Sequence, residues 1–210
     1  LGHCNEKDTL FQLQTECFFP CMQKIVEDII RNCTSCQFCA NNSDRNKMPM
    51  QVIERKAPFV TWGMDFVGPL PKTPRGNQYL VTAIDYGTGW AYATPLQARL
   101  GVAATKLVKQ IIENHGFPHS ITTDNGSEFN GHVYQEFLQQ HNIKHNRISP
   151  YHPQSNGLVD RFHGTLVGSM RKFCVSDKQS EWDLYLGLAL FGYCTSKTAG
   201  LERSPFYMCY

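Results

Sequence analysis

The sequence predicts an α/β fold in which helices flank a mixed five-stranded sheet, with a small helical domain ahead of it. Three apolar runs separated by turn residues open the larger part, as is typical of strands joined by hairpins. Helical and strand-like patterns alternate after them, and this order predicts a mixed sheet covered by helices. A cysteine-rich helical segment and a polar linker precede both.

The first 40 residues are helical in pattern. Four apolar residues recur at i and i+4 spacing and predict a helix with one apolar stripe: Ile25, Val26, Ile29 and Ile30. The stretch 41–47 is polar and precedes a Met-Pro pair, which indicates a linker. We therefore expect a small domain at 1–45, a linker at 46–57 and a larger domain at 58–210.

The larger domain opens with three predicted strands, at 59–67, 78–86 and 89–95, separated by turn signals at 74–77 and 87–89. The patterns that follow alternate between the helical period of about 3.6 residues and the strand period of two. They predict helices at 101–114, 130–141 and 182–193 and strands at 119–123 and 143–148. Before the last of these helices, apolar residues recur at i and i+4 and predict a further helix with a buried stripe: Leu158, Phe162, Leu166 and Met170.

Composition limits the classes of protein. At 210 residues the chain has room for one full domain and a small one, and its 41% hydrophobic content is typical of a folded protein. The net charge of +2 is too low for a protein that coats DNA, so a nucleic-acid surface would be local. No apolar run approaches a membrane span and no signal-peptide pattern is present, so we expect no membrane partner. Because the chain starts at Leu1 rather than Met, we expect a fragment or a conceptual translation.

The cysteines are unevenly distributed. Six of the nine fall within the first 39 residues, and an odd total would leave one unpaired in a disulfide framework. The spacing Cys33-x2-Cys36-x2-Cys39 indicates metal binding in a reducing compartment instead.

Three aspartates are the strongest candidates for catalysis. Asp65 lies in the first strand, Asp124 directly follows the strand at 119–123, and Asp160 begins a helical pattern after 35 intervening residues. A single Asp at such a place is usually a turn former or a helix cap, as we expect for Asp85 and Asp183. Three carboxylates delivered by separate elements, however, are what two divalent ions about 3.5–4 Å apart require.

Three segments carry a family resemblance: Trp62 to Leu70 (WGMDFVGPL), Thr123 to Gly126 (TDNG) and Ser149 to Gly157 (SPYHPQSNG). They resemble the catalytic core of a retroelement integrase, with the greatest similarity to the gypsy-type retrotransposon class. The resemblance extends over nearly the whole chain and implies an RNase H-like fold. It also implies a strand-transfer site of two Asp and one Glu, with 35 residues before the Glu, and two Mg2+ or Mn2+ ions.

By this resemblance Asp65 and Asp124 match the first two catalytic positions, and the third falls on Asp160 rather than Glu. The Asp160 carboxylate is withdrawn by about 1.5 Å, the length of one C–C bond. Mg2+ accepts oxygen ligands at about 2.0–2.1 Å with little tolerance, so the shorter side chain is expected to weaken the second ion or to bind it through water. Transposases of the mariner type resemble the same fold and use three aspartates, so an active enzyme and an impaired one both stay open.

The loop before Asp160 is expected to contact DNA by the same resemblance. Its matching residues are Tyr151, His152, Gln154, Ser155 and Asn156, to which we add Arg161 and His163. His163 shares a helical face with Asp160 and stands where the family commonly has Asn. Cys194 is a second departure, because Tyr-Asn-Thr is usual there.

Basic residues flank this loop and allow two interpretations, a solvated face or phosphate contacts. They are Lys144, His145, Arg147, Arg161, Arg171 and Lys172.

The N-terminal segment is similar to the zinc-binding domain of integrases, which uses two His and two Cys. His3 matches one ligand, with 29 residues before Cys33, and Cys36 is the third visible ligand of Zn2+. The second His would precede His3. The sequence offers Cys4, Cys39, Cys17 or Cys21 as a substitute fourth ligand, while buried free thiols are the alternative for the whole cluster.

Three functions are therefore compared. The first is DNA integration by metal-dependent polynucleotidyl transfer, acting on DNA, as a homo-oligomer and in the nucleus. The second is a catalytically impaired, decayed or host-adopted integrase that binds DNA or supports assembly. The third, an RNA–DNA hybrid nuclease of the same fold, ranks last because it needs neither the integrase-like loop nor the zinc-like domain.

Overall fold

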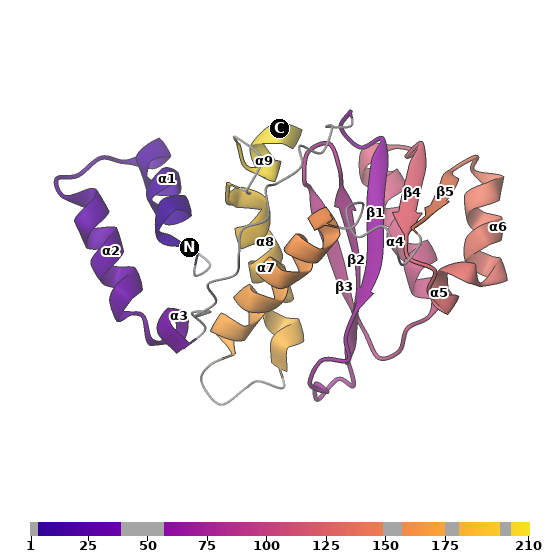
Figure 1. Ribbon diagram of the computed structural model, residues 1–210, viewed down its shortest axis with the longest axis horizontal. Helices are drawn as coiled ribbons and strands as arrows, with labels where there is room; N and C mark the ends of the chain where they lie inside the picture. The colour runs from indigo at the N-terminus through magenta and orange to yellow at the C-terminus, as the bar shows by residue number, and fades with distance from the viewer. Residues whose placement is uncertain (1–3, 39–56, 149–156, 175–180, 198–202) are drawn as a thin grey trace.

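A mixed five-stranded sheet forms the centre of the larger domain (Figure 1). The computed structural model describes residues 4–38, 57–148, 157–174, 181–197 and 203–210. The sheet has the order β3-β2-β1-β4-β5, made of β1 (Thr61–Val67), β2 (Tyr79–Asp85), β3 (Ala91–Leu96), β4 (Ser120–Thr123) and β5 (Lys144–Arg147). The first three strands pair antiparallel, whereas β4 is parallel to β1 and to β5. The predicted α/β class and mixed sheet are confirmed.

Helices cover both faces of the sheet (Figure 1). They are α4 (Gly101–His115), α5 (Ser127–Asn130), α6 (His132–Gln140), α7 (Gly157–Phe173), α8 (Trp182–Thr195) and α9 (Pro205–Cys209). Helices α4 to α6 lie on one side, and α7 and α8 lie on the other. The predicted stripe on α7 is buried at Phe162, Leu166 and Met170, because these side chains pack on that second face of the sheet.

Alternation along β1 decides which side chains face which layer. Trp62, Met64 and Phe66 belong to the hydrophobic core under α4 to α6. Gly63 faces the opposite layer, where an added Cβ would lie 2.7 Å from Val159 of α7. Because successive residues of a strand point to opposite faces, Asp65 shares the α7 side with Gly63.

Two elements differ from the sequence-based expectation. The helix predicted at 130–141 is confirmed as α6, whereas the four-residue helix α5 before it was not predicted; Gly131 separates the two with an extended backbone at φ −62° and ψ 141°. The short helix α9 was not predicted. Its N-terminus is capped by Ser204, whose Oγ accepts a hydrogen bond from Tyr207 N, and Pro205 suits the first helical position.

The N-terminal region is helical, as its pattern predicts. It comprises α1 (Glu6–Glu16), α2 (Met22–Asn32) and α3 (Thr34–Phe38). The predicted stripe on α2 is only partly buried: Val26 is 2% exposed, whereas Ile25 and Ile29 are 42% and 64% exposed. Met22, four residues before Val26, supplies the other buried side chain of α2, so the stripe that packs is narrower than the pattern indicated.

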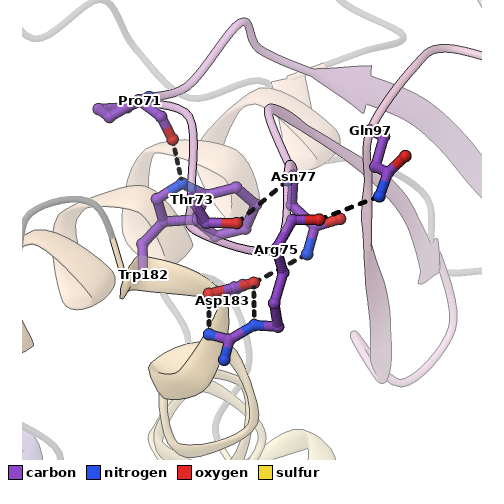
Figure 2. A network of polar contacts seen from close by, with 7 residues as sticks. All are labelled: Pro71, Thr73, Arg75, Asn77, Gln97, Trp182 and Asp183. Carbon is purple, nitrogen blue, oxygen red and sulfur yellow. Dashed lines mark hydrogen bonds and ion pairs between the residues drawn. The ribbon is translucent and has the colours of Figure 1, made fainter.

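A polar network joins the loop between β1 and β2 to the first turn of α8 (Figure 2). Arg75 donates to both carboxylate oxygens of Asp183, at 2.8 Å from Nε and 2.6 Å from Nη2, and Asn77 Nδ2 donates to the same carboxylate at 2.8 Å. Trp182 Nε1 donates to the Pro71 carbonyl at 2.7 Å. Asp183 thus fastens a loop to a helix.

None of the described helices has the length and apolar character needed to cross a lipid bilayer.

Candidate active site and metal centre

Asp65 lies on the central strand of the sheet, next to both of its neighbours. On β2 its antiparallel partner is Thr82. On the other side, the parallel register pairs Gly63 of β1 with Thr122 of β4, and two further residues along both strands bring Asp65 beside Asp124. Neighbouring strands are about 4.8 Å apart, so the sheet itself brings the first two predicted carboxylates together.

Asp124 is exposed and is held in a tight turn directly after β4. Its Oδ1 accepts a hydrogen bond from Gly126 N at 2.9 Å. A Cβ at Gly126 would lie 2.8 Å from Glu128 Oε2 and 3.0 Å from Asp124 Oδ1, so a larger residue here would displace one of these carboxylates. Glu128 is therefore a further carboxylate near Asp124, and it also pairs with Arg99 at 3.6 Å. In the sequence, Glu128 was indicated only by its position four residues after Asp124.

The first turn of α7 brings Asp160 to Asp65, and His163 comes with it. One ligand atom from each of Asp65, Asp160 and His163 lies within 4.8 Å of the other two. His163 Nδ1 is 3.7 Å from Asp65 Oδ2. Residues three apart share one face of a helix, which is why both α7 side chains reach the same point over the sheet. Asp124 lies outside this group of three.

Gly63 allows α7 to approach β1 this closely. A Cβ there would be 2.7 Å from Val159 Cγ2 and 2.8 Å from Tyr86 Oη, distances that real Cβ contacts do not show. Val159 immediately precedes Asp160, so the close approach is made at the residue that positions the third carboxylate.

The electrostatics of the site follow from burial and from like charges. Burial, together with the neighbouring Asp124 and Asp160, raises the pKa of Asp65 to about 6, against the opposing effect of the Phe66 N–H. Burial also raises the pKa of Asp160. It lowers the pKa of His163 to about 4, so the imidazole is neutral at pH 7. Crowded carboxylates beside a neutral imidazole are a donor set that fits a divalent cation.

The structure describes only two of the residues predicted to contact DNA, Arg161 and His163. Tyr151, His152, Gln154, Ser155 and Asn156 all lie outside the described residues. Arg161 is exposed, and its Nε donates to the Gly157 carbonyl at 2.8 Å, one turn back along α7. His163, which we also predicted to contact DNA, lies in the group with Asp65 and Asp160.

The basic residues lie in different surroundings. His145 is bonded within the fold, to Thr123 Oγ1 at 2.8 Å and to Gln135 Nε2 at 2.9 Å. Arg147 pairs in register with Thr123 and therefore lies next to the turn that holds Asp124. The pair at 171–172 occupies the last turn of α7, about 16 Å along the helix from Asp160.

Two of the predicted zinc ligands lie together at the start of α3. Interactions with the Cys36 N–H and side chain lower the pKa of Cys33. Cys4, one suggested substitute, has its Sγ 3.0 Å from Ser196 Oγ at the end of α8. His3 and Cys39 are outside the described residues, and within those residues no group of three potential ligands includes Cys33 and Cys36.

Comparison with known families decides the identity of the chain. Residues 55–153 match the family model described as integrase core domain, and residues 1–42 match the integrase zinc-binding domain. The chain belongs to the retroelement integrase family. The two matched segments contain Asp65 and Asp124, and Cys33 and Cys36.

Relatives of this integrase chain come from retrotransposons and retroviruses. It is 29% identical over 205 residues to the retrovirus-related Pol polyprotein from transposon 412 of Drosophila melanogaster, covering 97% of this chain and 16% of that protein. The chain spans 14–16% of the length of such curated relatives.

Solved structures share its fold. A chain of the simian T-cell lymphotropic virus intasome in complex with PP2A regulatory subunit B56 gamma matches with a TM-score of 0.66 and 22% identity, over 98% of this chain and 70% of that one. The HTLV-2 integrase catalytic core domain in complex with magnesium, a trimeric form, matches with a TM-score of 0.60 and 21% identity. This match covers 75% of the integrase chain and 100% of that domain.

Proposed function

We propose that the chain acts in DNA integration by metal-dependent polynucleotidyl transfer, joining a DNA 3′ end to a target strand. The observation that carries the proposal is the convergence of Asp65 and Asp160 from a strand and a helix, with Asp124 directly after the end of the neighbouring strand. Bound divalent ions, Mg2+ or Mn2+, would supply activation of the attacking oxygen and stabilisation of the leaving oxygen. The side chains would therefore act mainly by positioning.

Each carboxylate has a distinct positioning role. Asp65 is fixed by the sheet and by the Phe66 N–H, which donates to its Oδ1 at 2.7 Å. Asp124 is fixed by its turn, through the hydrogen bond from Gly126 N at 2.9 Å. Asp160 is fixed by α7, whose N-terminal end also favours a negative charge. A rigid frame of this kind holds ligands without reorganisation during the reaction.

We propose that DNA lies over the part of the surface that carries the three carboxylates. The loop residues 151–156 immediately precede α7, and Arg161 and Arg147 flank the carboxylates on α7 and β5. Phosphate contacts by these groups would be independent of sequence and sensitive to salt. His3, Cys33 and Cys36 would hold Zn2+ in the N-terminal domain. We further propose assembly as a homo-oligomer and a nuclear location.

A strand-transfer assay on labelled DNA ends tests this function with Mg2+ or Mn2+ present. We expect product from the wild-type chain and a loss of at least about a hundredfold for Asp65→Asn. Asp183→Asn is the matched control, because Asp183 belongs to the loop network and should keep activity within about threefold.

Asp160→Glu extends the assay to the third position. The proposal of an active enzyme fails if the wild-type chain is inactive with both metals while Asp160→Glu is active. The location of the site would then stand, and the chain would be a DNA-binding or assembly module. DNA binding that survives Asp65→Asn and weakens with salt would support that outcome.

A further inference from the structure

His163 is a nitrogen donor inside a site that otherwise consists of carboxylates. It lies one helical turn after Asp160, and its side chain is 15% exposed. Its neighbours are Asp65 on β1, Thr82 on β2 and Asp160 on its own helix. The role of His163 rests on the proposed function, since both concern the same metal centre.

Hydrogen bonds determine which ring nitrogen carries the proton. Thr82 Oγ1 donates to the Asp65 carbonyl oxygen at 3.0 Å, and a hydroxyl has one proton to donate. We therefore assign the ring as donor in the second contact of Thr82 Oγ1, to His163 Nε2 at 2.7 Å. The proton is on Nε2, so Nδ1 carries a lone pair.

This lone pair faces another acceptor. Asp65 Oδ1 is occupied by the Phe66 N–H at 2.7 Å, which leaves Oδ2 directed at His163. Nδ1 and Oδ2 are 3.7 Å apart, too far for a hydrogen bond and with no proton between them. Two ligands of one octahedral ion lie about 3 Å apart. A small rotation of either side chain would place both atoms in one coordination shell.

We propose that His163 Nδ1 is a metal ligand together with Asp65 and Asp160, and that it directs the site towards a divalent first-row transition ion. Imidazole nitrogen suits such ions, whereas Mg2+ prefers an all-oxygen shell. Metal-binding imidazoles usually donate their other N–H to a fixed acceptor, the part taken here by Thr82. A nitrogen ligand one turn after Asp160 also adds a donor where the carboxylate is one carbon short.

Mn2+ is the probe that tests this assignment, since it is paramagnetic and reports the nuclei bound to it. The full chain is first given one equivalent of Zn2+ for its zinc site, weakly bound Zn2+ is removed by dialysis, and the protein is then titrated with Mn2+ or Mg2+ alone. Electron spin echo envelope modulation then detects any 14N nucleus coupled to the bound Mn2+. The variants are His163→Asn, Thr82→Val, Asp65→Asn and the control His132→Asn, whose ring on α6 is 87% exposed.

We expect 14N coupling in the wild-type chain and in His132→Asn, and none in His163→Asn. His163→Asn should weaken Mn2+ binding by about tenfold or more and Mg2+ binding by less than about threefold. Thr82→Val keeps the ring but removes its acceptor, and should weaken Mn2+ binding by about tenfold.

The possible failures are distinguishable. Mn2+ binding that Asp65→Asn abolishes, but that shows no 14N coupling in the wild-type chain, overturns the role of His163 and leaves the proposed function standing. Coupling that persists in His163→Asn also overturns it. If the wild-type chain binds no Mn2+ at a site sensitive to Asp65→Asn, the inference and the proposed metal centre both fail. The wild-type spectrum is decisive even if His163→Asn does not fold.

Discussion

Asp183 and Asp65 are both aspartates of the larger domain, but their surroundings are opposite. The Arg75 guanidinium, with help from Asn77, lowers the pKa of Asp183 to about 2. Burial and two neighbouring carboxylates raise the pKa of Asp65 to about 6. The negative charge of Asp183 is balanced by Arg75, a cation of the protein itself. The negative charge around Asp65 would be balanced by a bound metal ion. This difference distinguishes a structural carboxylate from one prepared for a metal ion.

The largest effect is expected from separating α7 from the sheet. Gly63→Ala places a Cβ 2.7 Å from Val159 and 2.8 Å from the Tyr86 hydroxyl, so α7 must shift and carry Asp160 away from Asp65. We expect a loss of about 2 kcal/mol in the free energy of unfolding, measured by urea denaturation, and weaker Mn2+ binding. The Arg75–Asp183 pair should be unaffected.

Gly168→Ala is the control for this substitution. Gly168 lies in α7 and an added Cβ would meet nothing within 4 Å, so the change should stabilise the helix by about 0.5–1 kcal/mol. If Gly63→Ala were as stable as the wild-type chain, the close approach of α7 to β1 would not be what positions Asp160.

A smaller effect is expected on the stability of the metal-free protein, where substitutions of the two aspartates can be compared directly. Because the pKa of Asp65 is raised in the folded state, its ionised form opposes folding at pH 7. Asp65→Asn should therefore stabilise the metal-free chain, by about 1 kcal/mol. Asp183→Asn should destabilise it, because the Arg75 contacts are lost. Thermal unfolding at pH 7 measures both, and equal signs for the two variants would contradict the comparison.

The smallest effect is the pH dependence of the loop network. The pKa of Asp183 is about 2 in the folded state and 3.8 ordinarily, so its stabilising contribution is complete above about pH 4. It is lost as the pH falls from about 4 towards 2, where the folded carboxylate becomes protonated. The difference in unfolding free energy between the wild-type chain and Asp183→Asn should shrink over that window. A constant difference would mean that Arg75 does not hold the carboxylate.

Sequence patterns were sufficient where local periodicity reflects packing. The apolar run of β1 and the i, i+4 stripe of α7 gave this strand and the main helix correctly, because β1 is buried in the centre of the sheet and α7 buries one face. The same reasoning missed the short helix α5 and overestimated the apolar stripe of α2. A helix of one turn and the exposure of Ile25 depend on what surrounds them, which periodicity does not describe.

In the candidate site, too, some features follow from the sequence and others depend on tertiary packing. The sequence by itself predicted that Asp65, Asp124 and Asp160 belong to one integrase-type centre, and it determined that His163 shares a helical face with Asp160, because helical spacing is a local property. Only the tertiary structure decided what His163 faces. The register of β1 with β2 places Thr82 beside Asp65, and the packing of α7 lays the imidazole across both. The ring that the sequence suggested for DNA thereby lies 3.7 Å from the Asp65 carboxylate, with its other nitrogen 2.7 Å from a hydroxyl on a strand 81 residues away.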